Sequence, residues 1–506
     1  MPTVSTFHSF GLRILKENAN KLNFYHNLAI CDAELKQNIF QRVMLAKKGV
    51  GAVAGQISLY KQGCTHELEP EVLEFYKKYT EELRRLGAVD LDDLIYLTVK
   101  LFNKYPQICA KYQKQYHWIF IDECQDLNPR QYEMAGLLAG SGKPNFVMIG
   151  DPDQAIYGFR GADARVLEKF LTDYPEARVI DLDRSYRCPQ KVLNVAGQVL
   201  EKKEYLKGKE EDILVEVHEC LTQDSEADYI AQQIEKMIGG VRSFSIDSGV
   251  TGGQEESGIS SFSDFAILCR TSQQFQPLIK ALENHGVSYQ IVGTDPFYAK
   301  PPAIRIVQIL KELYFQSEVL LLDVGISNDS FFLLRSMVDL DVPLTEVLES
   351  VFKDIKLPDL IKKQFIDLAK GYGNKGLSFL QDLALRKGVD DWDKRSEAVS
   401  VMTLHAAKGL EFKSVFIPGC EHNLLPFELF GKKTGPELAE EARLFYVGVT
   451  RTKKYLTLTY AKNRTWKGRA LKQERSPFLA RLDVGLLELG KRVLDPKHSQ
   501  KQLALF

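Results

Sequence analysis

The sequence lacks several features that mark particular classes of protein. Its eight cysteines are scattered, and no two of them have the CxxC spacing of zinc or iron–sulfur sites. This pattern predicts reduced thiols and no metal centre of that kind. No apolar run approaches the roughly 18 residues that a membrane-spanning helix needs, and the amino terminus lacks the basic and apolar regions of a secretory signal. We expect a soluble cytoplasmic protein.

The sequence also has no excess of positive or negative charge. Lys and Arg number 66, Asp and Glu number 67, and the formal net charge is -1. A protein that moves on DNA can keep its basic residues local, so this balance neither supports nor excludes nucleic acid as a partner. The 506 residues, 44% of them hydrophobic, are enough for several globular domains.

A phosphate-binding loop of the form GxxxxGK[ST] is absent from the 506 residues. The nearest approach is the Gly-Ser-Gly-Lys stretch at 140–143. It has Leu137 and Pro144 where the motif needs Gly and Ser or Thr. A turn between a helix and a strand is a sufficient explanation for this stretch.

Two apolar segments, 118–121 and 146–149, predict strands of a parallel sheet that is buried on both faces. The first ends in Asp122 and Glu123, and the second in Gly-Asp. Ligands bind at the carboxyl ends of such strands. Asp122 could therefore hold Mg²⁺, and Glu123 could orient or deprotonate an attacking water. The alternative is a core strand that runs into an acidic loop.

Simple patterns predict other elements. Residues 7–112 read mostly helical, with Asp90 as the N-cap of one helix. Residues 298–397 also read helical, and residues 239–263 are rich in Gly and Ser, which is typical of a flexible surface loop. The segments expected to form further strands are 179–182, 264–270, 398–403 and 414–418.

Several motifs occur in a fixed order along the chain. They are TFHSF (6–10), DECQD (122–126), GDPDQAIYGFRGAD (150–163), RSYRCP (184–189), TLHAAKGLEF (403–412) and YVGVTR (446–451). Together they resemble the UvrD/Rep/PcrA group of superfamily 1 DNA helicases. The resemblance implies an α/β fold with two RecA-like, P-loop-NTPase-type parallel-sheet motor domains and two helical insertions. It also implies ATP-dependent 3′ to 5′ helicase or translocase activity on single-stranded and partly duplex DNA, in repair, recombination or replication.

The resemblance also implies an order of domains. The parts are a helical insertion of the first motor domain (1–112), the first motor domain (113–180), the second motor domain (181–297 and 398–485), its helical insertion (298–397) and a flexible tail (486–506).

By the same resemblance, ATP and Mg²⁺ are bound by residues from most of these motifs. Asp122 would hold Mg²⁺, Glu123 would activate water, Gln154 would sense the γ-phosphate, Arg187 and Arg451 would contact the phosphates, Tyr186 would stack on adenine, and Glu411 would lie near the ribose. Structural ion pairing remains the alternative for the two arginines, and core packing remains the alternative for Tyr186.

DNA contacts follow from the same motifs, since stacking needs flat aromatic faces and the backbone needs cations. The expected DNA-binding residues are Thr6, His8, Tyr157, Phe159, Arg160, Thr403, His405 and Lys408. Phe159 departs from the tryptophan that is usual in the family. For His8 and Phe10 the alternative is core packing. A basic run from Lys453 to Arg475, which includes Arg464, could add phosphate contacts or simply be solvated.

Family members carry an adenine motif, a phosphate loop and a further DNA-binding motif before TFHSF. Three explanations for their absence from this sequence remain open: a truncated reading frame, one half of a split protein, or a catalytically inactive remnant that binds DNA or the sliding clamp without ATP turnover.

The last five residues, QLALF, resemble the peptide by which bacterial proteins bind the DNA sliding clamp. Leu503, Leu505 and Phe506 would fill apolar pockets, and Gln502 would supply directional hydrogen bonds. Folding of this tail onto the protein's own surface, or a chance match, is the alternative.

Overall fold

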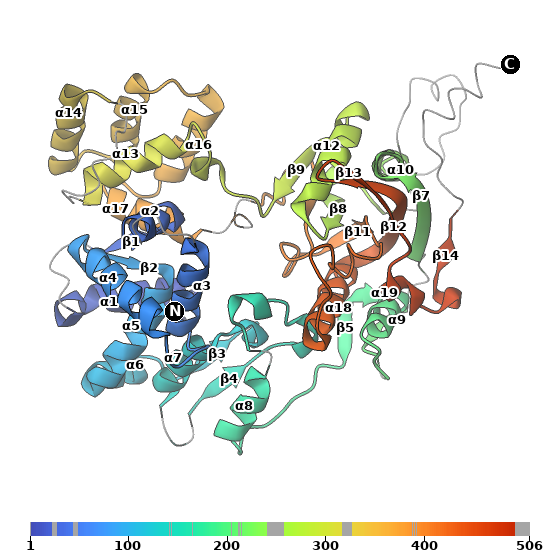
Figure 1. Cartoon of the computed structure of the whole chain (residues 1–506), viewed down its shortest axis with the longest axis horizontal. Coiled ribbons are helices and arrows are strands. Elements are labelled where there is room, and N and C mark those ends of the chain that lie inside the picture. The colour runs from blue at the N-terminus through green and yellow to red at the C-terminus, as the bar shows by residue number, and fades with distance from the viewer. Residues whose placement is uncertain are drawn as a thin grey trace. The chain divides into compact units, whose positions relative to one another are not determined.

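The computed structural model divides the chain into two compact units (Figure 1). Unit 1 comprises Met1–Gly150, Phe159–Phe170 and Asp295–Lys387, and unit 2 comprises Asp151–Gly158, Leu171–Thr294 and Gly388–Phe506. The structure describes every residue except 1, 23–27, 44–48, 141, 143, 164, 204, 211–212, 214, 240–257, 316–325, 387, 389, 391 and 491–506. Among the residues it describes, no helix is long and apolar enough to cross a membrane.

A parallel sheet forms the centre of unit 2. Its strands lie in the order β14, β7, β12, β11, β8, β10 and β9, and every pair along this order is parallel. One further strand, β13, pairs antiparallel with β12. The strands are β7 (Val215–Thr222), β8 (Phe265–Cys269), β9 (Tyr289–Val292), β10 (Val399–Thr403), β11 (Phe412–Ile417), β12 (Thr452–Trp466), β13 (Arg469–Lys472) and β14 (Glu488–Leu489).

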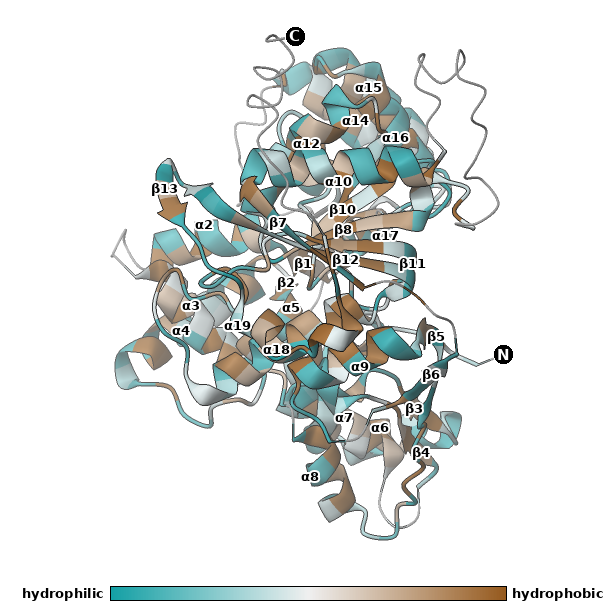
Figure 2. Cartoon of the chain, turned by 90° about the vertical axis from the view of Figure 1, so that its right-hand side faces the viewer, coloured by the Kyte–Doolittle hydropathy of each residue, from teal (hydrophilic) through white to brown (hydrophobic). Residues whose placement is uncertain are grey.

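Helices cover both faces of this sheet. They are α9 (Gln190–Val199), α10 (Gln223–Met237), α12 (Phe275–Asn284) and α18 (Gly435–Val449). Alternate residues of β8 point to opposite faces. Phe265 and Ile267 share a core with α10 and α12, whereas Ala266 and Leu268 share one with α9 and α18. In Figure 2 the strands β8 and β10 are brown, as expected for strands enclosed on both sides. This architecture confirms the expected α/β class with a parallel sheet.

The strands expected at 264–270, 398–403 and 414–418 are present as β8, β10 and β11. The prediction of a strand at 179–182 is wrong. These residues form no strand, and Val179, Ile180 and Leu182 are 61%, 70% and 80% exposed. Apolar composition alone does not make a strand, because a strand also needs a neighbour to pair with.

Unit 1 contains the two-stranded parallel sheet of β3 (Ile119–Ile121) and β4 (Phe146–Met148). The prediction that both faces of this sheet are buried is wrong, since Trp118 and Phe120 are 60% and 62% exposed. Only one face is covered, where Ile119 packs on Met134 of α7 (Pro129–Ala139). The other face carries Trp118 and Phe120, and neither residue belongs to a core cluster of the described residues.

The rest of unit 1 is mainly helical, as expected. Its helices before β3 are α1 (Phe7–Glu17), α2 (Ala33–Val43), α3 (Val50–Lys61), α4 (Pro70–Arg85), α5 (Leu91–Lys104) and α6 (Pro106–Gln115). Asp90 caps α5, which confirms its predicted role. Its carboxylate accepts the Asp93 N–H at 2.8 Å, and the Asp93 carboxylate accepts the Asp90 N–H at 3.2 Å.

The helices expected between 298 and 397 are also present. They are α13 (Ile304–Phe315), α14 (Asn328–Asp339), α15 (Leu344–Asp354), α16 (Asp359–Ala369) and α17 (Gly376–Leu385). In the sequence they interrupt the strands of unit 2, between β9 and β10, yet they belong to unit 1. The Gln381 side-chain amide donates to the Leu28 carbonyl at 2.5 Å, and the Gln308 amide donates to Glu34 at 2.7 Å.

A buried ion cluster joins α3 to the start of α5. The Lys61 ammonium lies 2.9 Å from the Asp90 carboxylate and 2.8 Å from the Asp93 carboxylate, and Lys61 and Asp90 are each 1% exposed. The Tyr79 hydroxyl donates to Asp90 at 2.9 Å. Although burial opposes its charge, the two carboxylates raise the pKa of Lys61 above its usual value.

Removal of the Lys61 charge should therefore destabilise this part of unit 1. Lys61→Met leaves Asp93 buried without the Lys61 ammonium and leaves Asp90 with Lys36, 3.3 Å away. Removal of one partner of a buried ion pair typically costs about 3 to 5 kcal/mol. Amide hydrogen exchange measured by mass spectrometry should show faster exchange across α3, α4 and α5. The exposed α4 residue provides a control, Lys77→Met, which should exchange like the wild type. Equal exchange in both variants would show that the cluster does not stabilise these helices.

Candidate nucleotide and DNA site

The acidic pair Asp122 and Glu123 directly follows β3, at the carboxyl end of the two-stranded sheet. Both side chains are exposed. Asp122 Oδ1 accepts the Glu123 N–H at 2.9 Å, and Glu123 Oε2 accepts from the side-chain amide of Gln125 at 2.5 Å. Gln125 itself is fully buried. The pair is thus presented at the sheet edge where α/β proteins bind ligands.

Glu123 has a backbone φ of 52°. A residue other than glycine rarely adopts a positive φ, and such strain is concentrated at functional sites. The turn is fixed on its far side, where the Cys124 N–H donates to the Ile149 carbonyl at 2.9 Å. This strained turn directs two adjacent acidic side chains away from the end of one strand.

The donor set of this turn fits a magnesium ion. Mg²⁺ typically takes one or two protein carboxylates and completes its octahedron with water and substrate phosphates. Asp122 and Glu123 supply exposed carboxylate oxygens for such a site. In the part of the chain that the structure describes, no group of three or more His, Cys, Asp and Glu side chains could hold a metal, so a site built entirely from protein ligands does not compete with this one.

Gln154 lies in the segment Asp151–Gly158, which follows β4 and belongs to unit 2. Its Nε2 donates to Asp151 Oδ2 at 2.8 Å, and its Oε1 accepts from Arg451 Nη2 at 3.1 Å. Burial raises the pKa of Asp151. The structure therefore brings together two of the residues assigned to the γ-phosphate, Gln154 and Arg451.

Arg451 is only 1% exposed and follows the end of α18. Its guanidinium donates to the backbone carbonyls of Val447 and Leu410 at 2.9 and 3.3 Å, as well as to Gln154. Hydrogen bonds to carbonyl oxygens offset the desolvation of the charge. They also fix the direction in which the remaining N–H groups point.

Lys408 and His405 contact the same segment. The Lys408 ammonium donates to the Gln154 carbonyl at 2.8 Å and lies 5.5 Å from the centre of the Tyr157 ring. The Tyr157 hydroxyl donates to the His405 carbonyl at 3.2 Å. Residues that were assigned to DNA contact therefore also hold the segment that carries Gln154.

Arg187 and Glu411, which were assigned separate roles, form an ion pair. Arg187 Nε donates to Glu411 Oε2 at 2.7 Å, and Lys453 Nζ lies 2.5 Å from Glu411 Oε1. Hydrogen bonding from Lys453, together with that from Arg187, lowers the pKa of Glu411 although burial opposes it. The structural ion pair considered as the alternative for Arg187 is present. The Arg187 side chain remains 33% exposed.

Two aromatic candidates present their rings to solvent. Tyr186 is 78% exposed, with the Arg184 guanidinium 5.4 Å from its ring centre, so the core-packing alternative is wrong. Phe159, which belongs to unit 1, is 63% exposed. The Arg160 side chain and residues Gln502, Leu503, Leu505 and Phe506 lie outside the described residues.

The motif at the start of the chain has a clear structural role. Thr6 caps α1, where its Oγ1 accepts the Ser9 N–H at 3.2 Å. Phe10 packs edge-on against Tyr116 with ring centres 5.6 Å apart, which confirms core packing for this residue. His8 is half-buried. Thr403 Oγ1 accepts the Ala406 N–H at 3.3 Å in the turn after β10.

The basic run from Lys453 to Arg475 is only partly available to phosphates. Arg464 is 5% exposed, so for this residue both alternatives, a phosphate contact and a solvated side chain, are wrong. The Lys462 ammonium lies 2.9 Å from a Glu219 oxygen, and Lys453 is paired with Glu411.

The sequence motifs do not identify two residues that have clear structural roles at the site. Arg443 Nε donates to the Ala155 carbonyl at 2.7 Å and so helps to hold the segment 151–158. Arg443 lies on α18 eight residues before Arg451, which follows the helix, and this spacing of about two helical turns was an available signal. No local pattern in the sequence marks Gln125 as the buried partner of Glu123.

Comparison with known proteins matches both parts of the chain to helicase families. Residues 1–175 match the UvrD/REP helicase N-terminal domain, and residues 180–323 and 356–463 match the UvrD-like helicase C-terminal domain. The ATP-dependent DNA helicase PcrA of Leuconostoc citreum is 28% identical over 99% of this chain and 77% of its own length. The protein of the same name from Bacillus subtilis is 28% identical over 96% of this chain and 76% of its own length. The chain therefore belongs to the UvrD/PcrA-like helicases of superfamily 1.

Proposed function

We propose that this chain is the motor of an ATP-dependent DNA helicase or translocase that moves 3′ to 5′ in the cytoplasm, in repair, recombination or replication. The observation that best supports this proposal is the segment Asp151–Gly158, since Gln154 near its centre contacts Arg451, and Tyr157 near its end contacts His405 and Lys408. One short segment thus joins a residue suited to sensing phosphate to an aromatic residue suited to stacking on a base. Two RecA-like motor domains would carry these groups.

In this proposal the nucleotide roles follow the geometry of each group. Glu123 acts as the base that orients and deprotonates the attacking water, because it is exposed next to Asp122, which would hold Mg²⁺. Bound Mg²⁺ would supply positive charge next to the phosphates. Arg187 and Arg451 face the developing charge on the γ-phosphate, and Glu411 keeps Arg187 in place until the nucleotide binds.

The remaining recognition groups divide between nucleotide and DNA. Tyr186 stacks on adenine with its exposed ring, and Glu411 lies near the ribose. Tyr157 and Phe159 stack on bases of a single strand, and Arg160 links these bases to the acidic pair. Backbone contacts come from Thr6, His8, Thr403, His405 and Lys408.

The enzymatic proposal makes a direct prediction for Glu123→Gln. Without the carboxylate base, DNA-stimulated ATP turnover should fall by about 10²- to 10⁴-fold, the range usual for a general base, while ATP binding is retained. Turnover should be measured with single-stranded DNA on the longest reading frame that contains these 506 residues. An unchanged rate for Glu123→Gln, or no DNA-stimulated turnover in the wild type, would refute the proposal.

A second candidate function is a chain that binds DNA without turning over ATP. The observation that favours it is the absence of a GxxxxGK[ST] motif from the 506 residues, because that loop supplies the backbone N–H groups and the Lys that surround the phosphates. Equilibrium binding of Mg-ATP to the 506-residue chain distinguishes the two candidates. Submicromolar affinity with steady turnover would exclude the inactive alternative.

We further propose that the QLALF sequence at 502–506 binds the bacterial sliding clamp. A peptide of residues 495–506 should bind purified clamp with a dissociation constant on the order of micromolar, as expected for a segment that loses conformational entropy on binding. The double variant Leu505→Ala, Phe506→Ala should not bind. Equal binding by that peptide, or none by the native one, would rule out this role.

A further inference from the structure

We propose that a cavity between α4 and α5 in unit 1 binds a small aromatic phosphate monoester, whose ring enters the cavity and whose phosphate contacts cations at the opening. The cavity has a volume of about 210 Å³. Its wall comes from α4, α5, the strand β2 (Ala88–Asp90) and the short helix η1 (Ala19–Leu22). No residue of the candidate nucleotide and DNA site belongs to the described wall, so the inference does not rest on the proposed function.

Apolar side chains from all four elements line the cavity. They are Leu22, Leu83, Ala88, Val89, Leu97 and Leu101. Leu83, Val89 and Leu101 are also buried in the core of unit 1, so this part of the wall is firmly packed. An apolar cavity of about 150 Å³ can hold a benzene ring. The volume here is therefore sufficient for a body of one or two rings, and the wall favours one that is mainly apolar.

Two tyrosines complete this wall. Tyr76 of α4 and Tyr96 of α5 both line the cavity. Tyr60 of α3 packs on both of them, with its ring centre 5.5 Å from that of Tyr76 and 6.2 Å from that of Tyr96. The Arg130 guanidinium lies 5.5 Å from the centre of the Tyr96 ring. These contacts hold the tyrosines in place before a ligand binds, and aromatic side chains pack favourably on another aromatic ring.

The hydroxyl of Thr80 is a polar group in this wall that lacks a partner. Thr80 lines the cavity from α4, and its hydroxyl oxygen is buried with no hydrogen-bond partner among the described residues. Buried hydroxyls are normally hydrogen-bonded. A ligand that brings a polar ring atom to this position would form a bond that the protein does not make by itself. The edge of a nucleobase carries such atoms.

Asp93 is the one acidic residue among the described residues of the wall. Its carboxylate lies 2.8 Å from the Lys61 ammonium and accepts the Asp90 N–H at 3.2 Å. Burial and the neighbouring Asp90 carboxylate raise the pKa of Asp93 above its usual value. Asp93 therefore adds no uncompensated negative charge that would repel an anion from the cavity.

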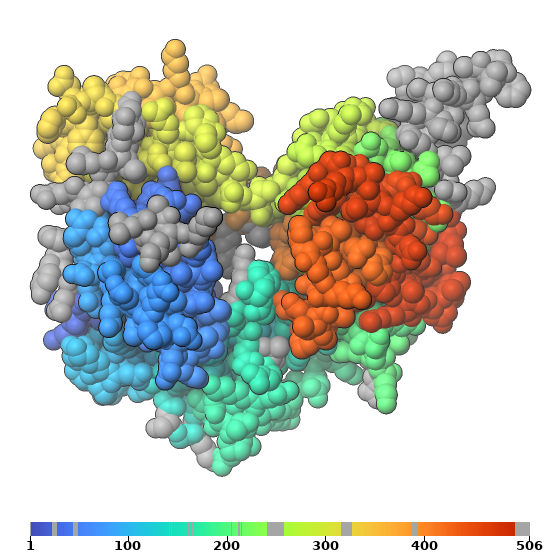
Figure 3. All heavy atoms as spheres, in the orientation of Figure 1, coloured from blue at the N-terminus to red at the C-terminus, as the bar shows by residue number. Residues whose placement is uncertain are grey.

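Four cations lie where the cavity meets solvent. All four are exposed and line the cavity: Lys21, Arg84, Lys100 and Lys104. Among the described residues, none of them has a carboxylate within ion-pair distance. The Lys100 ammonium lies 5.8 Å from the centre of the Tyr96 ring, which brings it next to the aromatic part of the wall. In Figure 3 this part of unit 1, drawn in blue, reaches the surface on the face that is seen.

The position of these cations alone would not indicate a site. Basic residues are common in the last turn of a helix, where they complement the helix dipole, and Lys21, Arg84 and Lys104 occupy such positions. The combination is more specific, because the same cavity also has an apolar wall and a buried hydroxyl without a partner. A ligand with a charged end and a planar end satisfies all of these groups together.

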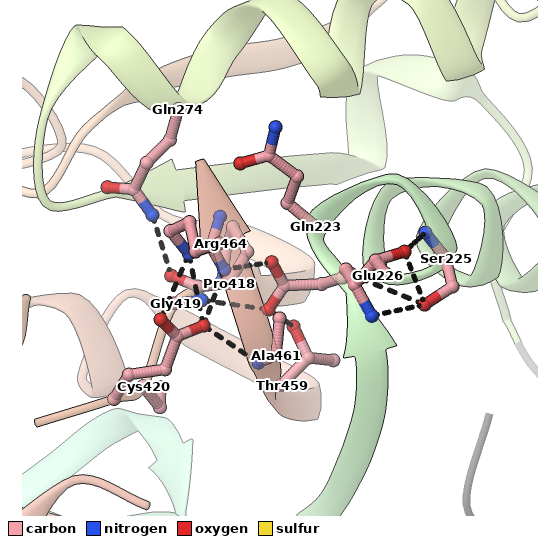
Figure 4. Close-up of polar contacts among 12 residues, drawn as sticks. Gln223, Ser225, Glu226, Gln274, Pro418, Gly419, Cys420, Thr459, Ala461 and Arg464 are labelled. Atoms are coloured by element: carbon pink, nitrogen blue, oxygen red, sulfur yellow. Dashed lines mark hydrogen bonds and ion pairs between the residues drawn. The ribbon is translucent and has the colours of Figure 1, made fainter. Parts of the chain in front are cut away.

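The buried cation of unit 2 provides a contrast (Figure 4). Arg464 lies at the base of the ribbon that β12 forms with β13. Its Nη2 donates to Glu226 at 2.5 Å and to Glu421 at 2.6 Å, and its Nε donates to both Glu421 oxygens. These bonds stabilise the fold and use up the guanidinium. The cations at the cavity in unit 1 keep their N–H groups for solvent or a ligand.

The chemistry favours a phosphate monoester over a carboxylate. A phosphate monoester carries a charge of roughly −1.5 to −2 at pH 7 and has three acceptor oxygens, which suits several cations, and Arg84 can bind two of these oxygens at once. The apolar wall suits the ring, and Thr80 suits a polar atom on it. A nucleoside monophosphate has all of these features. A nucleic-acid strand fits less well, because the cavity holds a single ring system.

Binding of 1-naphthyl phosphate to the full chain, followed by its fluorescence anisotropy, tests the cavity. We expect one site with a dissociation constant on the order of 10 to 100 micromolar, as is usual for a ligand of this size. Lys100→Gln and Arg84→Gln should each weaken binding roughly tenfold, because each removes a charged hydrogen bond to the phosphate. Lys77→Gln, on α4 but outside the cavity wall, is the matched control and should bind like the wild type. No binding by the wild type, or equal binding by all three variants, would overturn the proposal.

Thr80→Val tests the contact with the ring, since it replaces the hydroxyl by a methyl group of similar size. The affinity for guanosine monophosphate, measured by displacement of 1-naphthyl phosphate, should fall roughly fivefold. The affinity for 1-naphthyl phosphate itself should not change, because its ring has no polar atom. An unchanged affinity for guanosine monophosphate, or an equal loss of both ligands, would overturn the contact between Thr80 and the ring.

Hydrogen exchange locates the ligand without ATP or DNA, so its result is independent of the proposed function. Saturating 1-naphthyl phosphate should slow exchange in peptides that cover 76–84 and 88–104 and leave the segment 151–158 unchanged. Slower exchange in 151–158 alone would place the ligand at the candidate nucleotide site and overturn the proposal. Displacement of the probe by oligothymidylate at lower concentrations than by guanosine monophosphate would assign the cavity to nucleic acid and overturn it as well.

Discussion

The candidate site depends on the hydrogen bonds that fix the segment Asp151–Gly158 to the rest of unit 2. Three cationic side chains, Arg451, Lys408 and Arg443, donate hydrogen bonds to this segment. Two of the bonds go to backbone carbonyls, so they fix the path of the chain and not only one side chain. Without these contacts, Gln154 Oε1 would lose its donor Arg451, and the ring of Tyr157 would lose the Lys408 ammonium beside it.

Buried arginine and lysine side chains recur as the means by which this fold holds its irregular segments. Arg451 is satisfied mainly by carbonyl oxygens, whereas Arg464 and Lys61 are each satisfied by two carboxylates. A buried charge of this kind is expensive unless its hydrogen bonds are complete, so it tolerates little displacement of its partners. In each case the charge lies where a loop, a ribbon or a helix start must be held in one position.

Local patterns in the sequence were enough to predict much of the fold. The apolar run that forms β8 and the capping role of Asp90 depend on near neighbours, which the sequence shows directly. The exposure of Phe120 and the missing strand at 179–182 depend instead on which elements cover or pair with a segment. Apolar composition carries no information about such partners.

The residues of the candidate site differ in the same way: local motifs identify them, but their contacts depend on residues that are distant in the sequence. The motifs identified the residues, but they did not show that Arg187 is held by Glu411, which is distant in the sequence. Arg464 was read as part of a solvated basic run, and it is buried because Glu226 and Glu421 come to it from other elements. Charge patterns along the chain cannot distinguish a surface cation from one whose partners arrive from elsewhere in the fold.

The most direct test of the account is the hydrogen exchange of the segment Asp151–Gly158 in the wild type and in Arg443→Gln. The account predicts faster exchange of this segment in the variant, because the Ala155 carbonyl loses its charged donor, with exchange in β8 and β10 unchanged. Identical exchange of the segment in the two proteins would contradict the claim that unit 2 holds it in place.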